Sequence, residues 1–110
     1  MSSVPERGDL VYINLDPQAG HEQSGKRPCI VLSPEKFNRL TKFTVICPIT
    51  SKQKGYPFEV QLPDNLAVHG VILTDQVKSV DKTARNLKIV GKAPKETVQE
   101  CLDYIATFLS

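Results

Sequence analysis

A short polar segment between two apolar runs holds the side chains of this chain that could transfer protons or bind a phosphate. It contains His21 and Glu22 and ends at Lys26 and Arg27. Cleaving RNA without a metal requires a base for the ribose 2′-hydroxyl, an acid for the leaving 5′-oxygen and a cation for the crowded phosphorane. His21 or Glu22 could transfer the protons, and the guanidinium of Arg27 could form a bidentate pair of hydrogen bonds with the phosphate. The residue types therefore suit phosphodiester cleavage, while their spacing is weak evidence for it.

The same segment also fits a solvated loop of mixed charge, and its composition favours neither interpretation decisively. In that alternative Arg27 forms a surface ion pair, with Asp16 for example, which contributes little to stability. Thr50 could add a hydroxyl to a site from a neighbouring strand, or it could simply end that strand. Both alternatives remain open at the level of these residues.

A second polar segment follows Thr50 and is rich in lysine. Ser51, Lys52, Lys54 and Tyr56 lie in it, before the alternating run PFEVQL. Lysines beside an aromatic ring could track RNA phosphates while the ring stacks on a base, or they could form an ordinary basic hairpin tip. Asp75 and Gln76 stand between two apolar runs, where Asp commonly forms a turn but a carboxylate can also bond a base edge.

Apolar periodicity predicts a mainly β protein with added helices, an α+β chain. Short strands are expected at 10–15, 28–32, 44–49, 57–62, 70–74, 76–80 and 87–90, with one helical turn at 81–85. A short helix over 35–40 would be capped by Ser33, with Pro34 in its first turn. The long helix over 94–109 carries an apolar stripe expected to face the core: Val98, Leu102, Ile105 and Leu109. Short strands closed by a terminal helix favour a strongly curved sheet or partly open barrel.

Composition limits the class of protein further. The chain has 110 residues, a net charge of +2 and a 40% hydrophobic content, which suits one domain spanning residues 1–110. No apolar run approaches the roughly 20 residues of a membrane span, and the N-terminus lacks a secretory signal, so a cytoplasmic location is expected. The cysteines, three in number, fit a reducing compartment and buried positions. His21 and His69 stand apart from other ligand residues, so neither a metal nor a cofactor is expected.

The motifs resemble one family when they are taken together. GDL, DP, GHEQ-x-G-x-RP and IVLSP are followed by PIT, KGYPFEV and TDQVKSVD, from about Arg7 to the C-terminal helix. In this order and spacing they resemble the MazF/PemK toxins of bacterial toxin–antitoxin systems. KGYPFEV and DQVKS are closer to the MazF branch, whereas HEQ and FNR are closer to the PemK/Kid branch.

The resemblance implies an SH3-like barrel of the CcdB/MazF type that works as a homodimer. It implies a sequence-specific, metal-independent endoribonuclease that cuts single-stranded mRNA and leaves a 2′,3′-cyclic phosphate and a 5′-hydroxyl, inhibiting translation and growth. It also implies a cognate antitoxin, MazE- or PemI-like, whose disordered acidic C-terminal segment covers the RNA groove, with DNA contacted only through that antitoxin. Such a segment would suit the surface of Arg27, Lys52 and Lys54.

Residue roles follow from the resemblance position by position. Arg27 and Thr50 match the residues usually assigned to catalysis. Glu22 matches an important acidic residue of the MazF branch, and His21 and Asp75 match the proposed proton-transfer residues of the PemK branch. Lys26, Ser51, Lys52, Lys54, Tyr56, Asp75 and Gln76 are the expected RNA-binding residues.

One position departs from the PemK pattern. Leu73 stands where that branch has a catalytic Arg, so Arg27 is expected to stabilise the transition state, with Thr50 assisting. The general base stays open. Two rival hypotheses keep the fold: a CcdB-like toxin that binds DNA gyrase, and an inactive interaction domain. The His21–Arg27 chemistry argues against the gyrase alternative.

Overall fold

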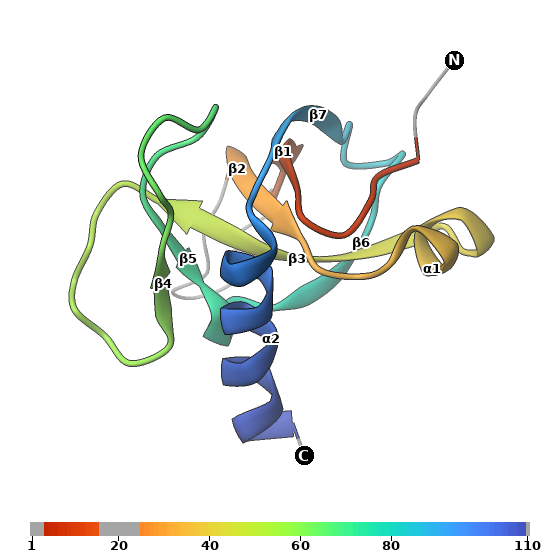
Figure 1. The fold of residues 1–110 in the computed structure, drawn as a ribbon. Helices are drawn as coiled ribbons and strands as arrows, with labels where there is room; N and C mark the ends of the chain where they lie inside the picture. Colours follow the sequence, from red (N-terminus) through yellow and green to blue (C-terminus); the bar gives the residue numbers. More distant parts are fainter. Residues whose placement is uncertain (1–3, 16–24, 110) are drawn as a thin grey trace.

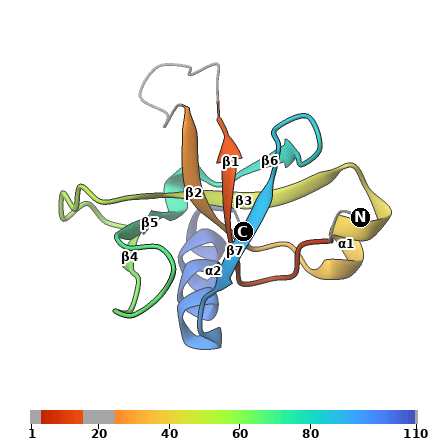
Figure 2. The same cartoon turned by 90° about the horizontal axis from the view of Figure 1, so that it is seen from above.

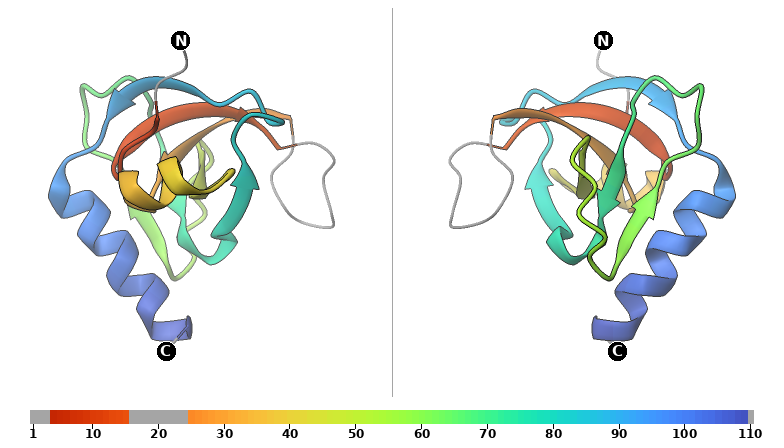
Figure 3. Two further views of the ribbon diagram at one scale, coloured as in Figure 1. Left: turned by 90° about the vertical axis from the view of Figure 1, so that its right-hand side faces the viewer. Right: turned by 90° about the vertical axis from the view of Figure 1, so that its left-hand side faces the viewer.

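A curved antiparallel sheet of seven strands makes up most of the structure, a computed structural model that describes residues 4–15 and 25–109 (Figure 3). Its strands are β1 (Asp9–Asn14), β2 (Lys26–Val31), β3 (Phe43–Thr50), β4 (Glu59–Gln61), β5 (Val71–Leu73), β6 (Lys78–Asp81) and β7 (Lys88–Lys92). The order is β4-β5-β3-β2-β1-β7, and β6 also pairs with β3. The helices are α1 (Glu35–Leu40), a 3₁₀ turn η1 (Thr74–Gln76) and α2 (Lys95–Leu109). The predicted mainly β fold with a C-terminal helix is confirmed.

The long strand β3 connects the two halves of the sheet. Along its first part it pairs with β6, in the register Thr44↔Val80, and near its end it pairs with β5, in the register Ile49↔Ile72. Helix α1 lies beside the start of β3, and the connection to β4 projects beyond its other end (Figure 1). Seen from above, β1, β2 and β7 cross steeply over β3 (Figure 2). This twist lets one β-strand contribute to both halves of the sheet.

Each face of the sheet carries its own buried cluster, because successive side chains of a strand point to opposite faces. The inner cluster, enclosed by the curve of β1, β2, β3 and β6, consists of Val11, Ile13, Leu15, Cys29, Val31, Ile46 and Val80. The outer cluster lies on the α2 side and includes Leu10, Ile30, Cys47, Ile49, Val60, Ile72, Val98 and Cys101. Strand alternation thus decides which functional side chains can share a face.

The predicted apolar stripe of α2 is only partly correct. Val98 is buried, and Leu102 and Ile105 pack against the outer cluster. Leu109 is 70% exposed, so its placement in the core was wrong. The last turn of α2 extends past the outer cluster, where Phe108 contacts Phe58 instead.

The start of α1 also differs from the prediction. Pro34 is the N-cap residue, and no side chain caps the helix. The Ser33 hydroxyl instead donates to Asn38 Oδ1 and accepts the Val45 N–H at 2.8 Å. Ser33 therefore joins α1 to β3 rather than closing the helix end.

Several strand boundaries shift for local reasons. Pro28 lies inside β2, but the paired register with β3 begins only at Cys29↔Pro48, so the missing N–H falls at the end of that ladder. Strand β4 begins at Glu59 because Phe58 has a φ of 73°, outside the β region. Asp81 ends β6 and accepts hydrogen bonds from the N–H groups of Thr83 and Ala84 within a turn. No helix among the described residues is long and apolar enough to cross a membrane.

Candidate functional site

The ladder between β2 and β3 brings Arg27 and Thr50 to the same end of the inner face. The paired residues are Cys29↔Pro48, Ile30↔Cys47 and Val31↔Ile46. Arg27 and Thr50 each lie two residues beyond the last pair, Cys29↔Pro48, so strand alternation puts both on the inner face. Arg27 is exposed and Thr50 is half-buried, so both lie where the inner cluster meets solvent. A guanidinium and a hydroxyl thus follow the inner cluster on neighbouring strands, on the same face of the sheet.

A second cation lies on the inner face, on strand β6. Lys78 is half-buried and pairs with Ile46, on the same face as Val80. Burial raises the pKa of the Cys29 thiol to about 12, and the charge of Lys78 opposes that rise. Lys78 is therefore within electrostatic reach of Cys29, two residues from Arg27. The sequence analysis missed Lys78, although the alternation in KSVD, with Val80 inward, was a signal for it.

The turn η1 carries Asp75 and Gln76, and the charge of Asp75 acts on Cys47 of the outer cluster. The turn connects β5, which pairs with Thr50 through Val71, to β6, and it lies against β3. Asp75 is exposed and Gln76 is half-buried. The preceding Leu73 is only 8% exposed and apolar. The described residues therefore place Arg27 and Lys78, rather than a side chain at position 73, as the cations of this region.

The connection from β3 to β4, residues 51–58, presents a basic surface beyond Thr50. Ser51, Lys52, Lys54 and Tyr56 are all exposed. Its backbone is tied at several points. The Lys52 N–H donates to Thr50 Oγ1 at 3.2 Å, and the N–H groups of Lys54 and Gly55 donate to the Glu59 carboxylate at 3.4 and 3.2 Å. Lys54 Nζ lies 5.8 Å from the centre of the Tyr56 ring, a distance suited to a cation–π contact.

Lys26 is separated from Arg27 by strand alternation. Lys26 pairs with Asn14, whereas Arg27 pairs with Ile13 of the inner cluster. Lys26 lines a shallow open hollow on the other face together with Asn14, Asn86 and Lys88. The two neighbouring cations of the sequence therefore serve two different surfaces.

Two predicted catalytic residues cannot be placed. His21 and Glu22 lie outside the described residues, as does Asp16, the suggested ion-pair partner of Arg27. Within residues 4–15 and 25–109, no three His, Cys, Asp or Glu side chains are grouped to hold a metal ion. The three cysteines are buried and unbridged, as predicted.

Comparison with known proteins identifies the family. A family model for PemK-like and MazF-like toxins of type II toxin–antitoxin systems matches residues 6–109. The endoribonuclease toxin MazF of Escherichia coli K12 is 44% identical over 96 residues, which cover 87% of this chain and 86% of that protein. The crystal structure of MazF from Deinococcus radiodurans superposes with a TM-score of 0.94 and 44% identity over 98% of both chains. A MazE–MazF structure from the same organism gives a TM-score of 0.88 and 44% identity, over 98% of this chain and 97% of that one.

The chain therefore belongs to the MazF/PemK family of toxins of type II toxin–antitoxin systems. It has the MazF fold, and it is an endoribonuclease toxin, an mRNA interferase. The gyrase-binding and inactive-domain alternatives receive no support from these relatives.

Proposed function

We propose that this endoribonuclease cuts single-stranded RNA at Arg27 and Thr50 by attack of the ribose 2′-hydroxyl on the adjacent phosphate. The observation that supports the proposal is the β2–β3 register, because Arg27 and Thr50 lie on the inner face, each two residues beyond its last pair. The new bond joins the 2′-oxygen to phosphorus, and the bond to the 5′-oxygen breaks. The products are a 2′,3′-cyclic phosphate and a 5′-hydroxyl, and no metal takes part.

Arg27 binds the phosphate and stabilises the charge of the phosphorane. Its planar guanidinium can donate two parallel hydrogen bonds to phosphate oxygens. Thr50 adds a hydroxyl donor to the same phosphate, and Lys78 adds a second positive charge from β6. Glu22 or His21 accepts the 2′-hydroxyl proton, and the leaving 5′-oxygen receives a proton from a group of the same site.

Bases flanking the cut bind along the β3–β4 connection. Ser51, Lys52 and Lys54 follow the phosphates, while Tyr56, which is 60% exposed, stacks on a base. Asp75 and Gln76 hydrogen-bond base edges and so contribute sequence preference. Lys26 contacts RNA only where the strand passes around the end of β2, because it lies on the other face from Arg27.

The toxin works as a homodimer and is silenced by a cognate MazE- or PemI-like antitoxin. The match to MazE–MazF structures of Deinococcus radiodurans supports such a complex. An acidic segment that folds on binding would neutralise the cations that otherwise bind phosphates. The antitoxin would thus compete with RNA for the same surface, and any DNA contact would be made through the antitoxin.

The test is cleavage of a long single-stranded RNA in the presence of EDTA. Wild-type protein should cut, and Arg27→Ala should lower kcat by about 100-fold or more. Thr50→Val, which keeps the shape but removes the hydroxyl, should lower kcat by about tenfold. A 2′-deoxy nucleotide at the cut site should block the reaction. The upstream fragment should end in a 2′,3′-cyclic phosphate and the downstream fragment should begin with a 5′-hydroxyl. Full activity of Arg27→Ala in EDTA would refute the proposal.

A further inference from the structure

We propose that the last turn of α2 positions the RNA-binding residues 51–57, through an aromatic cluster of Phe58, Tyr104 and Phe108. The inference rests on the proposed function in one respect: it takes the β3–β4 connection to be a surface that binds RNA. It assigns a role to residues that lie outside that surface.

Phe58 closes the connection in an unusual backbone conformation. Its φ is 73°, a region that bulky L-residues rarely adopt. Such a conformation persists only where the surrounding structure holds it. Because Phe58 directly precedes β4, its geometry sets the direction in which residues 51–57 leave the sheet.

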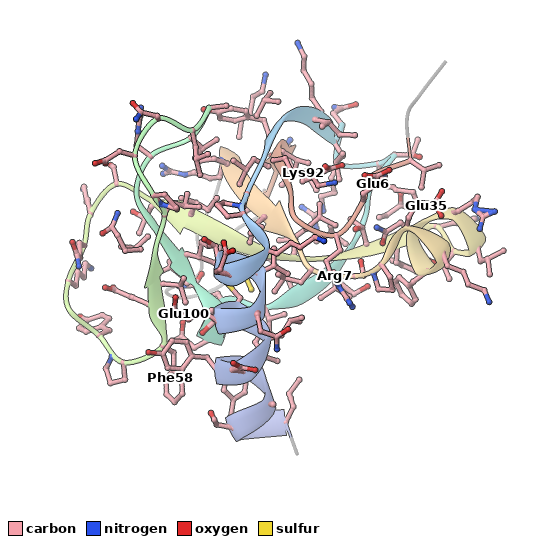
Figure 4. The ribbon with its side chains drawn as sticks, in the orientation of Figure 1. Glu6, Arg7, Glu35, Phe58, Lys92 and Glu100 are labelled. Atoms are coloured by element: carbon pink, nitrogen blue, oxygen red, sulfur yellow. The ribbon has the colours of Figure 1, made fainter. Side chains whose placement is uncertain are left out.

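The Phe58 ring is held by α2. Its centroid lies 5.5 Å from the ring of Tyr104 and 5.6 Å from the ring of Phe108, with interplanar angles of 81° and 83°. These are edge-to-face contacts, which stabilise beyond the area they bury. Figure 4 shows Phe58 beside α2, on the side from which the β3–β4 connection arrives.

The Phe58 carbonyl is held by the first residue of η1. Thr74 Oγ1 donates to it at 2.6 Å and the Thr74 N–H at 3.3 Å. Thr74 is fully buried and directly precedes Asp75. Phe58 is therefore a fixed point shared by α2, the RNA-binding connection and η1.

Hydrogen bonds tie the exposed part of the connection to Glu59, the residue after Phe58. The neighbouring Glu59 accepts hydrogen bonds from the N–H groups of Lys54 and Gly55, and its own N–H donates to the Tyr56 carbonyl at 3.4 Å. A shift of Phe58 would move Glu59 and, with it, the backbone that carries Lys54 and Tyr56. Phe108 is 41% exposed, so removing its ring leaves both buried clusters intact.

The experiment compares Phe108→Ala with Leu109→Ala. Leu109 is the adjacent residue, is 70% exposed and lies outside both buried clusters. Phe108→Ala should raise KM for a short RNA substrate about fivefold, the loss expected for one aromatic pair. Its kcat should stay within about twofold of wild type, because Arg27 and Thr50 are untouched. Phe108→Tyr should restore KM, since it keeps the ring, and Leu109→Ala should match wild type.

An unchanged KM in Phe108→Ala, or a KM effect equal to that of Leu109→Ala, overturns the inference, as does a loss confined to kcat. Thermal unfolding of each variant shows that the folded protein is assayed. If Phe108→Ala does not fold, Phe108→Leu, which is apolar but has no aromatic edge, is judged by the same criteria. Tyr56→Ala separates the two proposals. If it leaves KM unchanged, the RNA-binding role of the connection fails; if it raises KM while Phe108→Ala does not, only the positioning role fails.

Discussion

Gly70 lies directly against the backbone of Thr50, and a side chain at position 70 would displace the Thr50 carbonyl. A Cβ built on Gly70 would lie 2.8 Å from the Thr50 carbonyl carbon and 3.2 Å from Ser51 Cα, and its contact with the Thr50 oxygen would be closer still. The Gly70 φ of +127° also disfavours any L side chain. The position of a proposed catalytic hydroxyl thus depends on the absence of a side chain at Gly70, the residue just before β5.

Gly70→Ala should lower both stability and activity. The clash and the backbone strain together should reduce the free energy of unfolding by about 2 kcal/mol or more, as measured by urea denaturation. Displacement of Thr50 should also lower kcat for RNA cleavage in the protein that remains folded. Gly25→Ala is the control, because Gly25 has a φ of +76° but a Cβ there meets nothing within 4 Å. If both variants lose equal stability, backbone strain explains the effect and the close approach to Thr50 does not.

Lys78 should contribute to RNA binding through its charge. Lys78→Met should weaken binding of single-stranded RNA and reduce the slope of log K against log salt by about 0.7, the value for one phosphate contact. The measurement is fluorescence anisotropy with a 2′-deoxy substrate analogue over a range of salt concentrations. Lys36→Met, an exposed lysine on α1 at the opposite end of β3, should leave the slope unchanged. An unchanged slope in Lys78→Met would remove Lys78 from the site.

Asn38 should stabilise the α1 end of the molecule without affecting catalysis. Its side chain is fully buried, donates to the carbonyls of Pro5 at 2.8 Å and Ser33 at 3.1 Å, and accepts from the Ser33 hydroxyl. Asn38→Ala removes three hydrogen bonds of this buried network and should cost about 2–3 kcal/mol of unfolding free energy.

The control for Asn38 lies one residue further along α1. Arg39→Ala removes only an exposed ion pair with Glu35, at 3.5 Å, and should change stability by less than about 0.5 kcal/mol. The kcat of folded Asn38→Ala should equal that of wild type, because α1 lies at the opposite end of β3 from Thr50. A matching loss of kcat would mean that this polar network communicates with the site.

Buried thiols should make the fold sensitive to alkaline pH. Burial raises the pKa of Cys29 and of Cys101 to about 12, and it raises the pKa of Cys47 further. The folded protein keeps these protons above pH 9, whereas the unfolded chain releases them. Stability from this source is therefore complete below about pH 8.5 and falls as the pH rises toward 12, by roughly 1–2 kcal/mol per thiol at pH 10.

Urea denaturation at pH 8 and pH 10 measures this effect. Cys29→Ala should lose less stability between the two pH values than wild type does, because one titrating group is absent. Lysine titration is common to both proteins and cancels in the comparison. Native protein should also resist iodoacetamide at pH 8, since the thiols are buried and protonated. Equal pH dependence in the two proteins would contradict the assignment.

The local sequence was sufficient for the mainly β fold, the long helix and the family. The alternation of apolar and polar residues predicted most strands within a few residues of their observed positions. In a half-buried strand every second side chain faces the core, so apolar residues recur with a period of two. Local patterns gave the wrong role for two residues. The Ser33 hydroxyl bonds to β3 instead of capping α1, and Leu109 lies beyond the end of the core. The placement of Phe58 outside β4 depends on rings that lie some 50 residues further along the chain.

The sequence by itself therefore determined which side chains are available for phosphate chemistry: Arg27, Thr50 and the lysines after it. The tertiary structure decided which of them share a surface. The pairing of β2 and β6 with β3 puts Arg27, Thr50 and Lys78 on the inner face of the sheet, while strand alternation puts Lys26 on the other face. Both are consequences of pairing between strands far apart in the chain, and no local pattern of residues specifies that pairing.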